Sequence, residues 1–242
     1  MQRSVCFVLL AALALLITFT AASQLSLVPT GATASTAPGE WCPTCIDFLS
    51  QVIDQLLEII ANGGVIGSCN QLCSQLDGDE GLVCQLLCDY VGIEALVDLV
   101  DEVDPDPIYI CEELSVCPIS TNSSASFSQF ETSPEKGTQG TTFVVALTFV
   151  VNSTIGTGEL VVSVLPPGAP PALSVDAVEL LLNVGPGPYS YKIKVTTDPS
   201  EQEPWLPGKY AVTGLVCEGS CGSTHPYAKT LAKAQSAFTI TA

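Results

Sequence analysis

The side chains most able to do chemistry in this chain are its cysteines. Of these cysteines, Cys217 and Cys221 lie near the end of the chain, and Cys6 lies near its beginning. Cysteine pairs form disulfides in oxidising compartments, bind zinc as thiolates, or exchange electrons when a pKa is lowered. The other eight of the 11 cysteines lie within one stretch: Cys42, Cys45, Cys69, Cys73, Cys84, Cys88, Cys111 and Cys117.

The sequence Cys42-Pro-Thr-Cys45 has the spacing of a thiol-exchange motif. Such a site needs a buried strand before the motif, in a βαβ unit, and a spacer rich in Thr, Ala and Pro stands there instead. Zinc binding is disfavoured because no histidine lies near these cysteines. We therefore expect structural disulfides, with Cys217 and Cys221 forming a small local bridge.

Catalytic groups are sparse. His225, the single histidine, lies in a Gly-Ser-Thr-His-Pro segment with no nucleophile or acid at a recognisable spacing. The acid pairs Glu112/Glu113 and Asp101/Glu102 are typical of solvated helix faces, because a general acid or base needs a cleft that shifts its pKa. We expect a protein that is not an enzyme, with no catalytic residue, cofactor or metal.

The N-terminal segment has the pattern of a secretory signal. Arg3 precedes an apolar run over residues 5–17, and small residues follow at positions 21–23. The alternative, a membrane anchor, needs an apolar run of about 20 residues. Cleavage after a signal peptide of residues 1–23 would remove Cys6 and leave ten cysteines. This predicts a secreted protein, either extracellular or in the endolysosomal lumen.

Charge divides the rest of the chain into two domains. Residues 40–117 hold sixteen of the 25 Asp and Glu residues and no basic residue, whereas residues 118–242 hold nine acids and six lysines. So strong a negative field excludes nucleic acid as a partner. We expect a flexible spacer at 24–39, a helical domain at 40–118, a linker at 119–125 and a β domain at 126–242.

The helical domain is predicted from apolar residues that recur every three or four positions. Gly63 and Gly64 end the first helix, and Gly92 separates the third from the fourth. A polar turn is expected at 77–81. So small a core usually requires disulfides. The five helices are expected at about residues 41–61, 66–76, 82–91, 93–102 and 105–114.

The cysteine spacing indicates how these helices are joined. Cys69 and Cys73 are four apart, as are Cys84 and Cys88, so each pair lies on one helix face. If the two helices form an antiparallel hairpin, Cys73 meets Cys84 and Cys69 meets Cys88. The simplest closure of the first helix against the last then pairs Cys42 with Cys117 and Cys45 with Cys111, although eight cysteines allow 105 connectivities.

Six of these cysteines resemble the frame of the saposin B family. They are Cys42, Cys45, Cys73, Cys84, Cys111 and Cys117, and in that family the first pairs with the sixth, the second with the fifth and the third with the fourth. Cys69 and Cys88 depart from the frame and are read as an extra nested bridge. The segments Cys69-Asn-Gln-Leu-Cys73 and Cys84-Gln-Leu-Leu-Cys88-Asp-Tyr resemble more narrowly the countin family of secreted amoeba proteins.

The remainder of the chain is predicted to be an antiparallel, immunoglobulin-like β-sandwich. Residues 142–151, apolar nearly throughout, are expected to form a central strand, and a lipid-binding sandwich of the ML type is the alternative. Asn122 and Asn152 lie in glycosylation sequons. The expected strands are 125–131, 142–151, 159–165, 177–183, 189–196, 209–216 and 237–241.

The saposin resemblance implies a helical domain that hinges open and presents its apolar interior to lipid. We therefore expect a lipid- or membrane-interacting protein acting in extracellular signalling, with a cell-surface receptor or sister secreted proteins as further partners and oligomers possible. Acid should favour lipid binding, because model carboxyl groups lose their charge near pH 4. The alternatives are a pore-forming, amoebapore-like effector and a ligand that uses the helical domain only as a scaffold. The expected lipid-facing residues are Ile46, Leu49, Ile53, Leu56, Ile60, Leu86, Leu96 and Val100.

Overall fold

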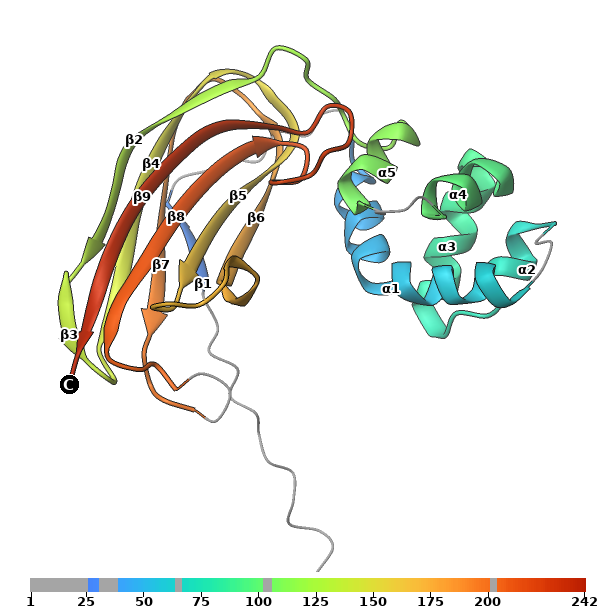
Figure 1. Ribbon diagram of the computed structural model, residues 1–242. Coiled ribbons are helices and arrows are strands. Elements are labelled where there is room, and N and C mark those ends of the chain that lie inside the picture. Colours follow the sequence, from blue (N-terminus) through green and yellow to red (C-terminus); the bar gives the residue numbers. More distant parts are fainter. Residues whose placement is uncertain (1–25, 31–38, 64–66, 102–105, 201–203) are drawn as a thin grey trace, which may run out of the picture.

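The computed structural model describes residues 26–30, 39–63, 67–101, 106–200 and 204–242. A helical domain and a β domain lie side by side, joined through helix α5 and the end of the β domain nearest to it (Figure 1). The expected signal peptide and most of the expected spacer lie outside the described residues. The described part therefore contains both domains that charge and composition separate.

The helical domain contains the five expected helices. Asp106 caps α5 by accepting hydrogen bonds from the Ile108 and Tyr109 amides, and Pro107 occupies its first turn. Gly92, at φ +91°, separates α3 from α4. The helices are α1 (Cys42–Gly63), α2 (Cys69–Cys73), α3 (Gly78–Val91), α4 (Ile93–Val100) and α5 (Pro107–Glu113).

The predicted polar turn at residues 77–81 is wrong for all but its first residue. Gly78, at φ +58°, already begins α3. Asp79 and Glu80 lie in the first turn of α3, where acidic side chains stabilise the positive end of the helix dipole. The polar composition therefore marks a helix start rather than a loop.

Five disulfides hold the two domains, and they join the pairs expected from the sequence. Four lie in the helical domain, and the fifth is local to the β domain. The core between the helices is built mostly from leucines and the bridges themselves, whose cysteines are almost fully buried except for the partly buried Cys69. The bridges are Cys42–Cys117, Cys45–Cys111, Cys69–Cys88, Cys73–Cys84 and Cys217–Cys221.

The β domain consists of two sheets around one apolar core. The four-stranded sheet has the order β1-β7-β4-β2, and the five-stranded sheet has the order β3-β9-β8-β5-β6. The strands are β1 (Ser26–Thr30), β2 (Ser124–Ser133), β3 (Lys136–Thr138), β4 (Thr142–Ser153), β5 (Ile155–Leu165), β6 (Val175–Val184), β7 (Gly187–Thr196), β8 (Gly208–Glu218) and β9 (Lys229–Thr241).

The core of this domain follows from alternation along its longest strands. Every second residue of β4 from Phe143 to Val151 is buried, and β4 lies between β7 and β2, as expected for residues 142–151. Phe238 stacks on Phe143 at 4.1 Å and on Tyr210 at 5.0 Å between ring centroids, which joins the two sheets. Such aromatic pairs contribute about 0.5 to 1.5 kcal/mol each beyond the area they bury.

The prediction of an immunoglobulin-like sandwich is wrong. The two sheets curl together into a half-barrel instead of stacking as flat layers (Figure 1). Two features absent from the expected pattern contribute: β3 pairs in parallel with β9, and β2 and the β8/β9 pair contain register shifts that increase strand twist. The alternation of apolar and polar residues along a strand does not by itself encode this curvature.

The prediction that residues 24–39 form only a flexible spacer is also wrong for residues 26–30. These form β1, which pairs antiparallel with the edge of β7. The backbone groups of β7 that β1 pairs would otherwise be open to solvent, so the strand forms for a tertiary reason. In chain order the helical domain is thus inserted between β1 and β2.

Candidate functional site

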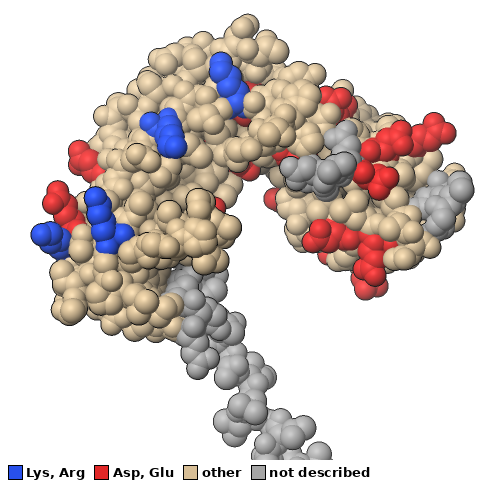
Figure 2. All heavy atoms as spheres, viewed as in Figure 1, with Lys and Arg blue, Asp and Glu red and all other residues tan. Residues whose placement is uncertain are grey.

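Charge is distributed unevenly over the molecule. Acidic side chains gather over the helical domain, whereas the lysines visible in the same view lie on the β domain (Figure 2). A surface of this kind repels anionic partners at neutral pH. Recognition of an anionic ligand by the helical domain would therefore have to rely mainly on apolar contacts.

An apolar pocket of about 380 Å³ lies where the start of α1, α3 and the turn after α5 meet. Trp41 and Tyr90 lie at its rim, 63% and 71% exposed, and Leu86 lines it while 53% exposed. Large apolar side chains this exposed on a small acidic domain are typical of binding surfaces. The remaining lining residues are Gly39, Glu40, Thr44, Cys45, Val83, Leu87, Ser115 and Val116.

The exposed side chains on α3 form one stripe. Leu82, Leu86 and Tyr90 are four residues apart and so share a helix face, and all three are exposed. The sequence contained the signal for this stripe, because α3 is apolar on most sides and so small a domain cannot bury every side of a helix. Of the exposed apolar residues at this site, only Leu86 was predicted from the sequence, and Trp41, Leu82 and Tyr90 were missed.

Most of the expected lipid-facing residues point into the core of the helical domain. Ile46, Leu49, Leu56, Leu96 and Val100 are buried, between 0% and 8% exposed. Ile53 and Ile60 are partly buried against the same core. These seven residues could meet a lipid only if the helices separated, whereas Leu86 is accessible in the structure as it stands.

Both sequon asparagines, Asn122 and Asn152, are exposed. Asn122 lies in the linker before β2, and Asn152 lies near the end of β4. Neither lines the apolar pocket.

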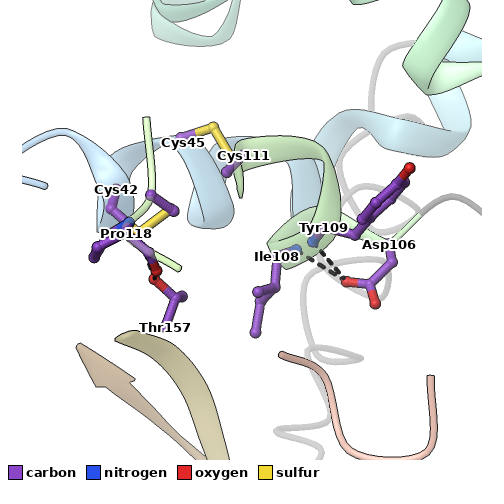
Figure 3. Close-up of a disulfide and its surroundings, with 9 residues drawn as sticks. Cys42, Cys45, Asp106, Ile108, Tyr109, Cys111, Pro118 and Thr157 are labelled. Carbon is purple, nitrogen blue, oxygen red and sulfur yellow. Dashed lines mark hydrogen bonds between the residues drawn. A yellow bond between two sulfur atoms is a disulfide. The ribbon is translucent and has the colours of Figure 1, made fainter. Parts of the chain in front are cut away.

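The two domains meet beside a disulfide of the helical domain. Cys42 and Cys117, the first and last cysteines of the helical domain, bond where the chain enters and leaves it. The buried Thr157 hydroxyl of β5 donates a hydrogen bond to the Pro118 carbonyl oxygen at 2.8 Å (Figure 3). The same hydroxyl oxygen, Thr157 Oγ1, lies 3.8 Å from the Cys42 sulfur. Cys45 bonds to Cys111 rather than to Cys42.

A second set of contacts holds α5 against the β8–β9 connection. The Ser220 hydroxyl lies 2.7 Å from Asp106 Oδ1, and Asp106 also caps α5 (Figure 3). The ring of Tyr109 stacks on His225 with centroids 4.3 Å apart. His225 is half-buried, and docking of the helical domain supplies it with a stacking partner that the local sequence does not reveal.

Two carboxyl groups are buried at this junction. Glu112 of α5 is 3% exposed, and its Oε1 has no hydrogen-bond partner. Glu218 of β8 is 1% exposed and accepts hydrogen bonds from the Ser120 amide at 2.9 Å and the Gly156 amide at 3.0 Å. The expectation that the Glu112/Glu113 pair is a solvated face is thus wrong for Glu112, although Glu113 is exposed.

The junction raises the pKa values of its carboxyl groups. Burial, and then the negative charge of Glu218, Asp106 and Glu113, raises the pKa of Glu112 to about 8. Burial also raises the pKa of Glu218, although the hydrogen bonds it accepts oppose the shift. The pKa of Glu159 on β5 is raised by burial and by Asp106, against a hydrogen bond from the Cys221 amide.

Taken together, the fold and these sites define a class: a two-domain, disulfide-rich protein with an acidic helical domain joined to a curled β domain. None of the helices in the described part of the chain is both long and apolar enough to cross a membrane. The Countin N-terminal domain family matches residues 40–115, and the Countin C-terminal domain family matches residues 125–242.

The chain is also similar to three proteins of Dictyostelium discoideum. It is 44% identical to Countin-1 over 201 residues, which cover 82% of this chain and 77% of the relative. It is 38% identical to Countin-3 over 202 residues, covering 83% and 90%, and 42% identical to Countin-2 over 187 residues, covering 76% and 72%. The chain belongs to the countin family.

Proposed function

We propose that this chain is a secreted, non-catalytic factor that binds lipid acyl chains in the pocket bordered by Trp41, Leu86 and Tyr90. The observation that carries the proposal is the pocket itself, about 380 Å³ of apolar space open at the surface. Its rim residues are a tryptophan and a tyrosine, the side chains that favour the boundary between water and hydrocarbon. The saposin-like cysteine frame and the countin relatives support a role in lipid contact and in extracellular signalling between cells.

Acid should strengthen this binding to anionic lipid. The helical domain carries sixteen acidic residues and no basic residue to offset them. Basic residues near an anionic surface contribute about 1 kcal/mol each, and carboxylates act in the opposite sense. As pH falls and carboxylates are neutralised, this repulsion declines and the apolar contact at the pocket remains.

Tryptophan fluorescence can test the pocket directly. The chain has two tryptophans, and only Trp41 lies at the pocket, since Trp205 is 5% exposed in the β domain core. Vesicles of phosphatidylcholine with brominated acyl chains should quench the wild-type protein, and Trp41→Phe should abolish that quenching. Unchanged quenching in Trp41→Phe would place the lipid contact elsewhere.

A matched pair of leucine variants then measures the contribution of the pocket. Leu86→Ser removes about half of a leucine's burial energy from the complex, or roughly 1 kcal/mol, which weakens binding about fivefold. Leu173→Ser makes the same change at a leucine 62% exposed in the β domain and should leave binding unchanged. Equal effects of the two variants would argue against the pocket.

The alternatives give different results in the same vesicles. A pore-forming effector would release a trapped dye, whereas a carrier or a peripheral lipid-binding factor would not. A scaffold that presents its surface only to a receptor would show neither quenching nor co-sedimentation between pH 4 and 7.5.

A further inference from the structure

Helix α5 has one side fixed to the helical domain and another side buried against the β domain. Cys111 bonds to Cys45 of α1 on the helical side. Ile108 points toward the β strands and is 2% exposed (Figure 3). Glu112 lies four residues after Ile108 and therefore on the same face of α5. A carboxyl group thus occupies the face of α5 that docks on the other domain.

The groups around Glu112 offer its charge no compensation. They are Asp106, which caps α5, Glu113 at the end of α5, and Glu218 of β8 across the junction, whose charge acts most strongly of the three. Oε1 of Glu112 is buried without a hydrogen-bond partner. A buried carboxylate beside other carboxylates is strongly unfavourable, but a neutral carboxyl group in the same place is tolerated.

The other titratable groups at the junction do not alter this balance. Glu159 of β5 is not among the groups that act on Glu112, and its own pKa is raised mainly by burial. His225 of the β8–β9 connection stacks on Tyr109. Lys229 of β9 lies opposite Glu218 in the strand register and is exposed. No cation acts on Glu112 among the described groups that shift its ionisation.

Hydrogen bonds around the junction connect the charge of Glu112 to the linker between the domains. Glu218 holds the linker through the Ser120 amide and also holds β5 through the Gly156 amide. The linker follows Cys117 directly, and Cys117 is bonded to Cys42 at the start of α1. A charge appearing on Glu112 would repel the carboxylate that fastens the linker.

We propose that Glu112 is a proton-controlled latch between the two domains. With its proton, it keeps α5 docked against β5 and β8. Without its proton, it releases the helical domain from the β domain, while the four bridges inside the helical domain keep its own fold intact.

The direction of the pH dependence follows from the raised pKa. The docked state binds the proton with a pKa of about 8, against 4.5 for an ordinary glutamate in the released state. The stabilisation by Glu112 is complete below about pH 4.5 and is lost as pH rises toward 8. Across that window the opening equilibrium constant rises by up to about tenfold per pH unit. Acid therefore closes the junction.

Hydrogen exchange of the full-length, disulfide-intact protein tests the latch. The reporters are the Ser120 and Gly156 amides, which donate to Glu218 in the docked state. For each amide, the exchange rate in wild type is divided by the exchange rate in Glu112→Gln at the same pH, so that the intrinsic exchange rate cancels. The wild-type to variant ratio should rise by up to about tenfold per pH unit from pH 5 to 8 and then level off.

Two controls separate the latch from other effects. Glu94→Gln makes the same change at an exposed glutamate of α4 that does not act on Glu112, and its ratio to wild type should stay flat with pH. Amides of β4, such as Leu147, report the interior of the β domain, and their ratios should also stay flat. A pH-dependent change in β4 equal to that at Ser120 would mean global unfolding and would overturn the proposal.

A measurement on the unmodified protein covers the case in which Glu112→Gln does not fold. Carboxyl carbon NMR of the wild-type protein should show Glu112 still protonated at pH 7, with the Ser120 and Gly156 amides losing protection as it titrates. Titration of Glu112 in the ordinary carboxyl range, or a flat exchange ratio across pH 5 to 8, would refute the latch.

Discussion

The two bridges that close the helical domain share one loop, and this determines what removing each of them should do. Cys42–Cys117 spans 75 residues and Cys45–Cys111 spans 66. In the chain-entropy description either bridge, acting alone, would stabilise the fold by about 4.4 kcal/mol. Because one is nested in the other, removing a single bridge frees a loop of only roughly nine residues, which corresponds to about 2.6 kcal/mol.

We therefore predict a specific pattern of non-additivity. Cys42→Ala with Cys117→Ala should lower the unfolding free energy of the helical domain by about 2.6 kcal/mol, as should Cys45→Ala with Cys111→Ala. Removing both bridges also opens the larger loop, which the intact Cys69–Cys88 bridge shortens to roughly 47 residues. The double removal should therefore lower the free energy by about 6.7 kcal/mol, roughly 1.5 kcal/mol more than the two separate effects combined.

The assay is guanidinium unfolding of the full chain, followed by the helical signal in far-ultraviolet circular dichroism. The five α-helices of the described chain all lie between residues 42 and 113, so that signal reports the helical domain. The control removes Cys217–Cys221, a bridge of the β domain, and should leave the helical transition in place. A loss near 4.4 kcal/mol for one nested bridge alone, or strict additivity, would refute the shared-loop reasoning.

Two other predictions concern the junction and the surface. Gly156→Ala places a Cβ 2.6 Å from the Ser120 nitrogen and should destabilise the β domain by about 1 to 3 kcal/mol in thermal unfolding. In the control Gly185→Ala, the added Cβ meets no atom within 4 Å and should not destabilise the domain. Equal melting temperatures of the two variants would contradict the packing argument. Asn122→Gln and Asn152→Gln should each remove one glycan from protein secreted by a glycosylating host, seen as a lower intact mass, and an unchanged mass would show that the sequon is unused.

Local pattern was enough to predict the helices and their bridges. The period of apolar residues along α1 is a property of neighbouring positions, and so are the four-residue spacings of Cys69 with Cys73 and of Cys84 with Cys88. A hairpin of two such helices brings the cysteines together with little dependence on the rest of the chain. The structure contains the bridges that this reasoning favoured.

Features set by distant contacts could not be predicted in the same way. Residues 26–30 become a strand because β7 presents an edge, and the curl of the β domain depends on twist and register shifts rather than on alternation. The acidic pair Glu112/Glu113 looks uniform in sequence, and only the docking of α5 distinguishes a buried carboxyl group from an exposed one. The α3 stripe is the exception, because its excess of apolar positions was visible in the sequence.

Two pH responses in this protein should therefore occur in different ranges and at different places. Acid would neutralise the carboxylates of the helical surface, and model carboxyl groups titrate near pH 4. The junction responds between about 4.5 and 8, and acid keeps it docked. Any lipid binding that acid promotes must then be carried out by a molecule whose domains remain docked. The site for that binding is the already open pocket beside Trp41 and Leu86, not the buried faces of α1 and α4.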